Sequence, residues 1–307
     1  MNPKQQLQLN ARIFKWKEML EVYPEIKSNK LKERGRKGVP DPLRGYAWMT
    51  LSQCNKHVEG EKSQHFKNVV QKFGSKKNVI SIFKDISRTF THHIYFTERY
   101  GKGQENLFKV LKALSIEQEE TGYVQGMGYM AGILMIYMDH EDAFFMLLSI
   151  MRDYDILDMY RPKMPGLART FYVHLSLTKK YLPKLHQHLL DNHYEPSMYG
   201  SQWFMTIYAI ALPFEVVLRI WDIFFAEGKN IIYRIALAIL KLNQEKLLTC
   251  DLDGIFNTIK QYSNNCDAEL LIKTALSYKF SGKLVEKFEE EFRENPREEF
   301  KRYITMG

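Results

Sequence analysis

The sequence predicts an all-α fold, because helical periodicity recurs along the chain and the signs of a β-sheet are missing. Apolar residues stand at positions i, i+3, i+4 and i+7, as on one face of an amphipathic helix, in Leu107, Val110, Leu111 and Leu114. Alternating apolar and polar residues between Asn-Gly or Asp-Gly turns do not occur, so a substantial sheet is not expected. If about two thirds of the chain is helical in segments of about 12 residues, about 15–17 helices result.

Further segments show the same periodicity. Asn10 is predicted to cap a helix whose buried side carries Ile13, Phe14, Trp16 and Leu20. Near the C-terminus, Pro296 is predicted to end a last helix, and the acidic segment from Glu286 to Glu299 is interpreted as solvated. The remaining stripes are Phe144, Leu147, Leu148 and Met151, then Ile235, Leu237, Ile239, Leu240 and Leu242, and finally Leu284, Phe288 and Phe292.

A break around Pro162, Pro165 and Gly166 divides the long helical region into two halves. No long linker lies between the halves, so they are expected to pack closely together. A fixed repeat period is missing, which disfavours a regular solenoid. The expected segments are a basic N-terminal lead-in helix at 1–37, a main domain at 38–280 with subdomains at about 38–160 and 161–280, and a charged C-terminal helix at 281–307.

Composition excludes several classes of protein. The 307 residues are 45% hydrophobic and 26% charged, and the 19 Phe, 18 Tyr and 4 Trp argue against a disordered chain. Cys54, Cys250 and Cys266 form no CxxC pair and are odd in number, which disfavours a disulfide scaffold or a zinc finger. The N-terminus has no apolar signal segment, and the longest apolar run, Met130–Met138, is shorter than the about 20 residues that a bilayer span needs. We therefore expect a cytoplasmic protein.

Basic residues are concentrated in the first third of the chain. The net charge of +8 is made up of +12 in residues 1–102 and −4 in the remainder. A basic segment of this kind fits a nucleic acid, an anionic lipid surface, or an acidic or phosphate-bearing protein as partner. Charge alone does not choose among these partners, and a solvated lysine-rich surface fits equally well.

Motifs for nucleotide or metal binding by this chain are not found. The sequence contains no P-loop, and Gly126–Ala131 matches G-x-G-x-x-A without the preceding strand that a dinucleotide site needs. The two histidine pairs, His92-His93 and His186/His188, lack the i, i+4 spacing of a helical zinc site. A serine in G-x-S-x-G is also missing. We therefore expect no cofactor and no metal on this chain.

Three clusters nevertheless combine residue types in patterns that suggest a functional site. In the first, Gly38–Trp48, Pro and Asp precede an apolar run as at the start of a helix. Arg44 lies one turn before Trp48, so the two side chains are expected to stack as a cation–π pair.

The second cluster is Ile82–Phe90. Ile82, Asp85 and Arg88 are three residues apart and therefore line one face of a helical turn. Asp85 is then placed to hold the Arg88 guanidinium by a charge-assisted hydrogen bond. The alternative is an ordinary surface ion pair.

The third cluster is Gly122–Gly128. Three glycines around Gln125 favour a turn at which another backbone or a ligand comes close. The alternative is the N-terminus of a helix with glycine retained for packing.

In this order and at these separations, the clusters resemble the TBC domain of Rab GTPase-activating proteins. The family motifs are R-x-x-x-W, I-x-x-D-x-x-R and Y-x-Q, and Gly128 stands where many relatives carry Asn or Ser. The likeness extends over about two thirds of the chain, from about residue 38 to about residue 242. The motifs correspond to Arg44/Trp48, Ile82/Asp85/Arg88 and Tyr123/Gln125, and later matching segments are 202–213, 218–224 and 233–238.

The resemblance implies an all-helical, V-shaped domain that acts on a GTPase in trans. Arg88 would be an arginine finger that neutralises charge on the phosphates, and Gln125 a glutamine finger that orients the attacking water. GTP and Mg²⁺ would be carried by the partner, a GTP-loaded Rab GTPase. The chain would then be a GTPase activator that regulates vesicle trafficking, and not itself a GTPase.

Supporting roles are expected for the residues around the two fingers. Asp85 is expected to orient Arg88, and Tyr123 to set the loop that carries Gln125. The other supporting residues are Arg44 and Trp48, expected to buttress the same surface, together with Ile82 and Gly126.

Other functions remain as alternatives. A non-catalytic TBC module would bind a GTPase as a scaffold, and loss of Arg88 or Gln125 would have marked it. A nucleic-acid binder is disfavoured because aromatic residues are not interleaved with basic ones in residues 1–102. A lipid binder acting through Lys27–Lys37 is disfavoured because one basic segment without an acyl anchor attaches weakly. We expect a cytoplasmic protein that reaches endomembranes indirectly, through the lipidated GTPase.

Overall fold

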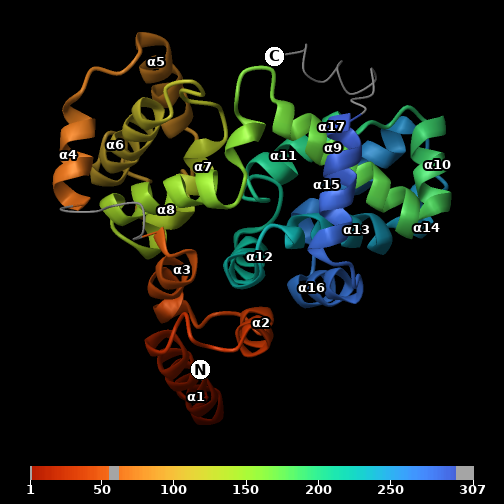
Figure 1. Ribbon diagram of the computed structural model, residues 1–307, viewed down its shortest axis with the longest axis horizontal. Coiled ribbons are helices and arrows are strands. Elements are labelled where there is room, and N and C mark those ends of the chain that lie inside the picture. Colours follow the sequence, from red (N-terminus) through yellow and green to blue (C-terminus); the bar gives the residue numbers. More distant parts are fainter. Residues whose placement is uncertain (1, 55–61, 295–307) are drawn as a thin grey trace. The chain divides into compact units, whose positions relative to one another are not determined.

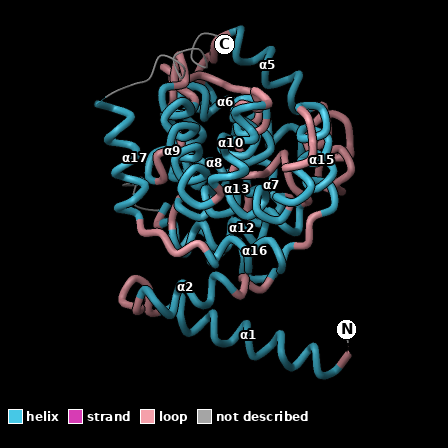
Figure 2. The backbone as a smooth tube through the Cα atoms, turned by 90° about the vertical axis from the view of Figure 1, so that its right-hand side faces the viewer, coloured by secondary structure: helices cyan, strands magenta, loops and turns pink. Residues whose placement is uncertain are grey.

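The computed structural model describes residues 2–54 and 62–294, and all regular structure in them is helical (Figure 1). These residues form 17 α-helices and several short 3₁₀ turns, with no strand among them (Figure 2). The predicted all-α fold is therefore confirmed, and the number of helices falls within the predicted range. None of the helices in the described part is long and apolar enough to cross a membrane.

The chain forms two compact units. Unit 1 contains the described residues up to Asp155 together with the segment Trp221–Gly228. Its elements are α1 (Pro3–Glu21), α2 (Ser28–Arg36), η1 (Asp41–Leu43), α3 (Arg44–Ser52), α4 (Lys62–Gln71), α5 (Lys76–Ile86), α6 (Lys102–Glu117), α7 (Met127–Tyr137) and α8 (His140–Asp153), with the second half of α12 (Phe214–Glu227).

Unit 2 contains Ile156–Ile220 and the described residues from Lys229 onward. Its elements are η3 (Leu157–Met159), α9 (Pro165–Tyr181), α10 (Pro183–Asp191), η4 (Pro196–Met198), α11 (Gly200–Met205), the first half of α12, α13 (Asn230–Leu242), α14 (Gln244–Leu247), α15 (Leu252–Asn265), α16 (Ala268–Ser277) and α17 (Gly282–Glu294).

Helix α6 is the centre of unit 1, because it contacts α4, α5, α7 and α8. Its predicted apolar stripe is fully buried, and the apolar residues of α8 are buried against it. Helix α7 is apolar on nearly every side and buried along most of its length. Because α5 and α7 both contact α6 and also contact each other, the end of α5 and the start of α7 belong to one packed layer.

Unit 2 is organised around α13 and α9. Helix α13 is buried on nearly all sides and contacts α9 and α16, as its uniformly apolar sequence predicts. Helix α9 in turn contacts α10 and α17. The Tyr208 hydroxyl donates to the Ile232 carbonyl at 2.7 Å, which satisfies a polar group in this otherwise apolar core.

The N-terminal segment differs from the prediction in three ways. Helix α1 begins at Pro3 and is capped by Asn2, whose side chain accepts from the Gln5 N–H, so the expected cap at Asn10 is wrong. The expected single lead-in helix is also two helices, α1 and α2, because Pro24 cannot continue the helical hydrogen bonding after α1. Phe14 lies on the exposed face of α1 and not on the buried face.

Helix α17 is less solvated than its acidic sequence suggests. Phe292 contacts the Tyr172 ring of α9, with 5.5 Å between ring centroids. Glu289 is buried on the same face and accepts from the Lys229 ammonium at 3.1 Å. The predicted solvated acidic segment is therefore wrong at Glu289, while Pro296 and residues 295–299 lie outside the described part of the chain.

His174 makes the stability of unit 2 sensitive to acid. Its ring is fully buried, with Nε2 2.9 Å from the Tyr199 hydroxyl and Phe204 beside it. Burial lowers the pKa of His174 from 6.5 to about 3, so the folded state keeps the imidazole neutral where the unfolded chain would protonate it.

We predict that this depressed pKa costs stability as the pH falls. Below pH 6.5, down to about 3, the free energy of unfolding should fall by about 1.4 kcal/mol per pH unit through His174. Denaturant unfolding at pH 7 and pH 5.5 should show a shallower loss in His174→Gln, whose amide can still bond Tyr199. The exposed His92→Gln variant should behave as the unmodified protein, and an equal pH slope in all three would contradict the assignment.

Candidate functional site

Arg88 stands in the turn that ends α5. The Arg88 N–H donates to the Asp85 carbonyl at 3.1 Å, and the Thr89 hydroxyl donates to the same carbonyl at 2.7 Å. These bonds close the helix one turn after Asp85 and leave the Arg88 side chain 51% exposed. Ile82 and Asp85 are buried on the inner face of α5. The motif thus places a buried acid beside an exposed guanidinium.

The Asp85 carboxylate bonds two residues at once. Its Oδ1 accepts from Arg88 Nε at 2.9 Å and also from Arg88 Nη2, as the sequence predicts. Its Oδ2 accepts from the Tyr123 hydroxyl, which comes from the loop before α7. The hydrogen bond to Asp85 raises the pKa of Arg88, and burial together with Asp85 raises the pKa of Tyr123. At neutral pH the site therefore holds a charged arginine and a neutral tyrosine around one carboxylate.

The loop that carries Gln125 depends on glycine. Gly122 has φ +63° and Gly126 has φ +104°, in the left-handed region that residues with a Cβ avoid. Gly126 also precedes the first residue of α7, so both alternatives for this cluster hold, a tight turn and a helix start. Between the two glycines, Tyr123 is buried and Gln125 is exposed.

A second bond joins the two segments. The Tyr129 hydroxyl, in the first turn of α7, donates to the Arg88 carbonyl at 3.2 Å. Together with the Tyr123–Asp85 bond, it ties the end of α5 to the start of α7 on two sides. The backbone on both sides of the site is therefore fixed by hydrogen bonds that are local to it.

Arg88 and Gln125 line a common cavity of about 260 Å³. Lys84 adds a second cation, whereas the one carboxylate, Asp85, is already bonded to Arg88. The cavity therefore offers positive charge and an amide to a group from another molecule, a combination suited to an anion. Its lining is Ser81, Lys84, Asp85, Arg88, Tyr123 and Gln125.

The structure brings together most of the predicted finger site. Asp85, Arg88, Tyr123 and Gln125 meet at the cavity, with Ile82 and Gly126 supporting the backbone beside it. Sequence reasoning missed Ser81 and Lys84. Both precede a site residue by four positions on α5, so helical spacing alone could have identified them.

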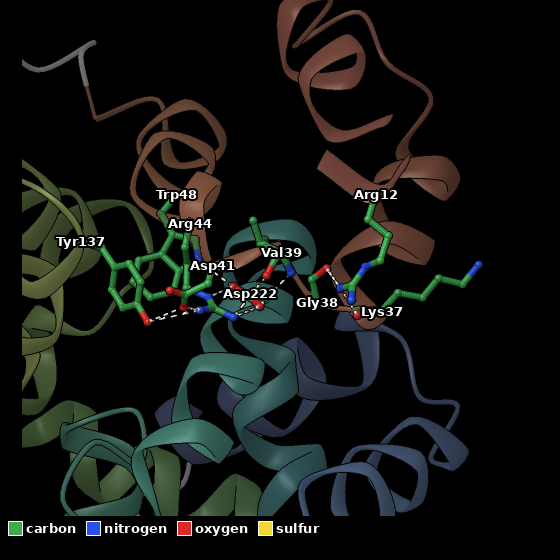
Figure 3. A network of polar contacts seen from close by, with 9 residues as sticks. All are labelled: Arg12, Lys37, Gly38, Val39, Asp41, Arg44, Trp48, Tyr137 and Asp222. Carbon is green, nitrogen blue, oxygen red and sulfur yellow. Dashed lines mark hydrogen bonds and ion pairs between the residues drawn. The ribbon is translucent and has the colours of Figure 1, made fainter. Parts of the chain in front are cut away.

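Arg44 and Trp48 lie in a different place, around the buried carboxylate of Asp222 (Figure 3). Asp222 Oδ1 accepts from Trp48 Nε1 at 2.9 Å and from Arg44 Nε at 3.2 Å. Its Oδ2 accepts from the Val39 N–H at 2.9 Å. Complete burial raises the pKa of Asp222 to about 6 although these donors favour its ionised form, so it is charged at neutral pH.

The same network reaches α7 and α1 (Figure 3). Arg44 lies over the ring of Tyr137, 5.3 Å from its centroid, so the expected stacking on Trp48 is replaced by stacking on Tyr137. Arg12 donates to the carbonyls of Lys37 and Gly38 at 3.0 Å each, which holds α1 against the segment before η1.

Helix length separates this network from the cavity that Arg88 and Gln125 line. Tyr137 is the last residue of α7 and Gly126 precedes the first, and a helix of 11 residues is about 16 Å long. Arg44 and Trp48 are therefore not brought to the surface that Arg88 and Gln125 share. Sequence reasoning missed Asp222, although one acid inside a long apolar run is a signal of a buried, paired charge.

Among the described residues, no group of three or more His, Cys, Asp or Glu side chains is arranged so that it could bind a metal ion. Cys54, Cys250 and Cys266 are free thiols.

Comparison with known proteins gives consistent matches. Residues 41–248, more than half of the chain, match the profile of the Rab-GTPase-TBC domain. The chain is 31% identical over 283 residues to the Ecotropic viral integration site 5 protein homolog of Homo sapiens, covering 90% of this chain and 34% of that protein. It is 35% identical over 259 residues to TBC1 domain family member 10A of Mus musculus, covering 82% and 51%. Identity to Rab GTPase-activating protein tbc-11 of Caenorhabditis elegans is 31% over 285 residues, covering 91% and 30%.

Solved structures agree with these matches. The flagellar RabGAP TBC domain of Chlamydomonas superposes with a TM-score of 0.77 at 27% identity, covering 89% of this chain and 93% of that one. The Ypt/Rab-GAP domain of Gyp1p superposes with a TM-score of 0.72 at 17% identity, covering 92% and 99%, and shows the shared fold alone. The chain spans about a third of the length of the Ecotropic viral integration site 5 and tbc-11 relatives.

We predict that the two arginine motifs contribute unequally to the stability of the fold. Asp222→Asn should lower the free energy of unfolding by about 3 kcal/mol or more, because it removes the buried counter-charge of Arg44 and leaves only the Asp41 carboxylate, which is 72% exposed. Arg88→Ala should cost less, about 1–2 kcal/mol, because the Arg88 side chain is half exposed and the buried Asp85 carboxylate keeps the Tyr123 hydroxyl as a donor. Urea unfolding of both variants measures the difference. A cooperative loss of folding in Arg88→Ala would show instead that Arg88 is part of the framework.

Proposed function

Because this chain belongs to the Rab-GTPase-TBC domain family, as its three motifs predict, we propose that it accelerates GTP hydrolysis by a Rab GTPase. Arg88 acts as the arginine finger and Gln125 as the glutamine finger. The observation that carries the proposal is that the exposed side chains of both residues line one cavity in unit 1, beside a carboxylate that orients Arg88.

The chemistry of phosphoryl transfer explains the need for both residues. Hydrolysis of GTP requires an oriented water and compensation of the charge that develops on the γ-phosphoryl and bridging oxygens. A slow GTPase lacks a cation at that point, and an arginine inserted from a second protein supplies it. A glutamine amide can both donate to and accept from a water, so Gln125 has the groups needed to orient it.

The pairing with Asp85 leaves Arg88 free to bind phosphate oxygens. Arg88 uses Nε and Nη2 for the carboxylate, and a guanidinium has five N–H donors. Three donors therefore remain for oxygens of the transition state while Asp85 keeps the side chain extended in one direction. Arg88→Lys is a poor substitute, because an ammonium cannot hold the carboxylate and fork onto two phosphate oxygens at once.

The partner brings the remaining chemistry. GTP and Mg²⁺ are bound by the GTPase, so this chain contributes two side chains in trans and is not itself a GTPase. A Rab GTPase carries a lipid anchor, and the chain reaches endomembranes through that partner and regulates vesicle trafficking there. Among the compared proteins that are at least 27% identical to this chain, the tbc-11 protein and the Chlamydomonas domain carry the Rab GTPase-activating description in their names, which supports this assignment.

We predict that both fingers are needed for stimulation but not for folding. In single-turnover assays with a panel of GTP-loaded Rab GTPases, Arg88→Ala should reduce the stimulated rate by about 10³–10⁵-fold. Gln125→Ala should also lose stimulation, because the water is no longer oriented. Both variants should keep the circular dichroism spectrum of the unmodified chain.

Matched controls separate a finger from an ordinary exposed residue. Arg293 is 57% exposed and pairs with the buried Glu289, much as Arg88 pairs with Asp85. Arg293→Ala and the exposed Gln64→Ala should retain full stimulation. If the chain binds a GTP-loaded Rab without accelerating hydrolysis, the proposed mechanism is wrong and the chain is a GTPase-binding scaffold.

A further inference from the structure

A second cavity lies directly beside the cavity that Arg88 and Gln125 line, and the proposed mechanism does not use it. It measures about 520 Å³ and is lined mainly by apolar atoms from the end of α5, the segment before α6 and the first turns of α6. Phe83, Ile86, Tyr100 and Phe108 form its apolar part. All of its lining residues belong to unit 1.

Two of these aromatic side chains are far more exposed than core residues. Phe83 stacks on Phe108 with 4.6 Å between ring centroids, yet 53% of Phe83 is exposed. Tyr100 is 76% exposed. Contact between large apolar side chains and water is unfavourable. Several such side chains grouped on one surface therefore mark a surface that another molecule covers.

Tyr100 has an unfavourable backbone conformation that a neighbouring side chain stabilises. Its φ is +61°, in the left-handed region that favours glycine. Gln104 fixes this conformation, because its side chain accepts from the Tyr100 N–H and donates to the Phe96 carbonyl, both at 3.0 Å. The Arg99 guanidinium lies 5.0 Å from the Tyr100 ring centroid. Unfavourable backbone conformations that neighbours fix in this way occur mainly at functional sites.

The two cavities adjoin along α5. Lys84 lines both of them, and Ser87, which lines the second cavity, is the residue before Arg88. A protein that receives Arg88 therefore covers the second cavity as well. The charge around it is positive, since Lys84 and Arg99 line it while Glu105 is paired with Lys102 and Lys109.

We propose that this second cavity is the docking site for an apolar side chain of the GTPase, flanked there by an acidic residue, and that Phe83 and Tyr100 set which GTPase is bound. The proposal rests on the proposed function for the identity of the partner. The surface then has two separate functions. Arg88 and Gln125 accelerate the reaction. Phe83 and Tyr100 determine the affinity for the GTPase. A few buried aromatic anchors commonly dominate the affinity of such an interface.

The test uses the full chain and purified Rab GTPases loaded with a non-hydrolysable GTP analogue, with affinity measured by calorimetry. Tyr100→Gly removes the side chain and suits the left-handed backbone, so it should leave the unfolding midpoint unchanged or raise it. Both Tyr100→Gly and Phe83→Ser should weaken binding by about 10-fold or more. In hydrolysis assays they should raise the half-saturating GTPase concentration, whereas Arg88→Ala lowers the maximal rate.

Phe14→Ser is the control, because Phe14 is 62% exposed on α1 in the same unit. Equal affinity of the unmodified chain, Tyr100→Gly and Phe83→Ser would overturn the docking proposal, and so would an equal loss in Phe14→Ser. Binding that depends on Tyr100 without any acceleration would overturn the finger mechanism and leave the docking site standing. Failure of the unmodified chain to bind any member of the panel would overturn both.

Discussion

The carboxylate of Asp85 is the interaction on which the proposed finger site depends. It is buried, and it accepts hydrogen bonds from Arg88, three residues later, and from Tyr123 in a different segment of the chain. A free arginine side chain on a surface samples many rotamers, and fixing it during a reaction costs about 2 kcal/mol of conformational entropy. Asp85 fixes Arg88 before any partner arrives, and the same carboxylate holds the loop that carries Gln125.

A second buried carboxylate, that of Asp222, connects distant segments of unit 1 by hydrogen bonds. Asp222 joins α12 to the chain before and within α3 through Val39, Arg44 and Trp48. The two acids differ in what surrounds them, because Arg44 is buried with Asp222 whereas Arg88 is half exposed beside Asp85. Of the two arginine motifs in the sequence, one therefore stabilises unit 1 and the other presents a cation to solvent.

Periodicity and short-range spacing made much of this structure predictable. The stripe from Leu107 to Leu114 depends only on residues one or two turns apart, and so does the Asp85–Arg88 bond. Contacts between segments that are far apart in the sequence produce no periodic or short-range pattern in it. Asp222 is 178 residues from Arg44, and nothing in local spacing connects the two. The left-handed backbone of Tyr100 was equally hidden, because it depends on the Gln104 side chain and not on a turn residue such as glycine or asparagine.

A double-mutant cycle measures whether Asp85 couples the two proposed fingers through Tyr123. Tyr123→Phe removes only the hydroxyl that bonds Asp85. Its effect on the maximal single-turnover rate should be measured in the unmodified chain, in Gln125→Asn and in Arg88→Lys, which are milder changes that leave a stimulated rate to measure. We expect a loss of about 10-fold or more in the unmodified chain and little further loss in either finger variant, because residues that act as a unit are not additive. The same fold-loss in all three backgrounds, or no loss in any, would contradict the coupling.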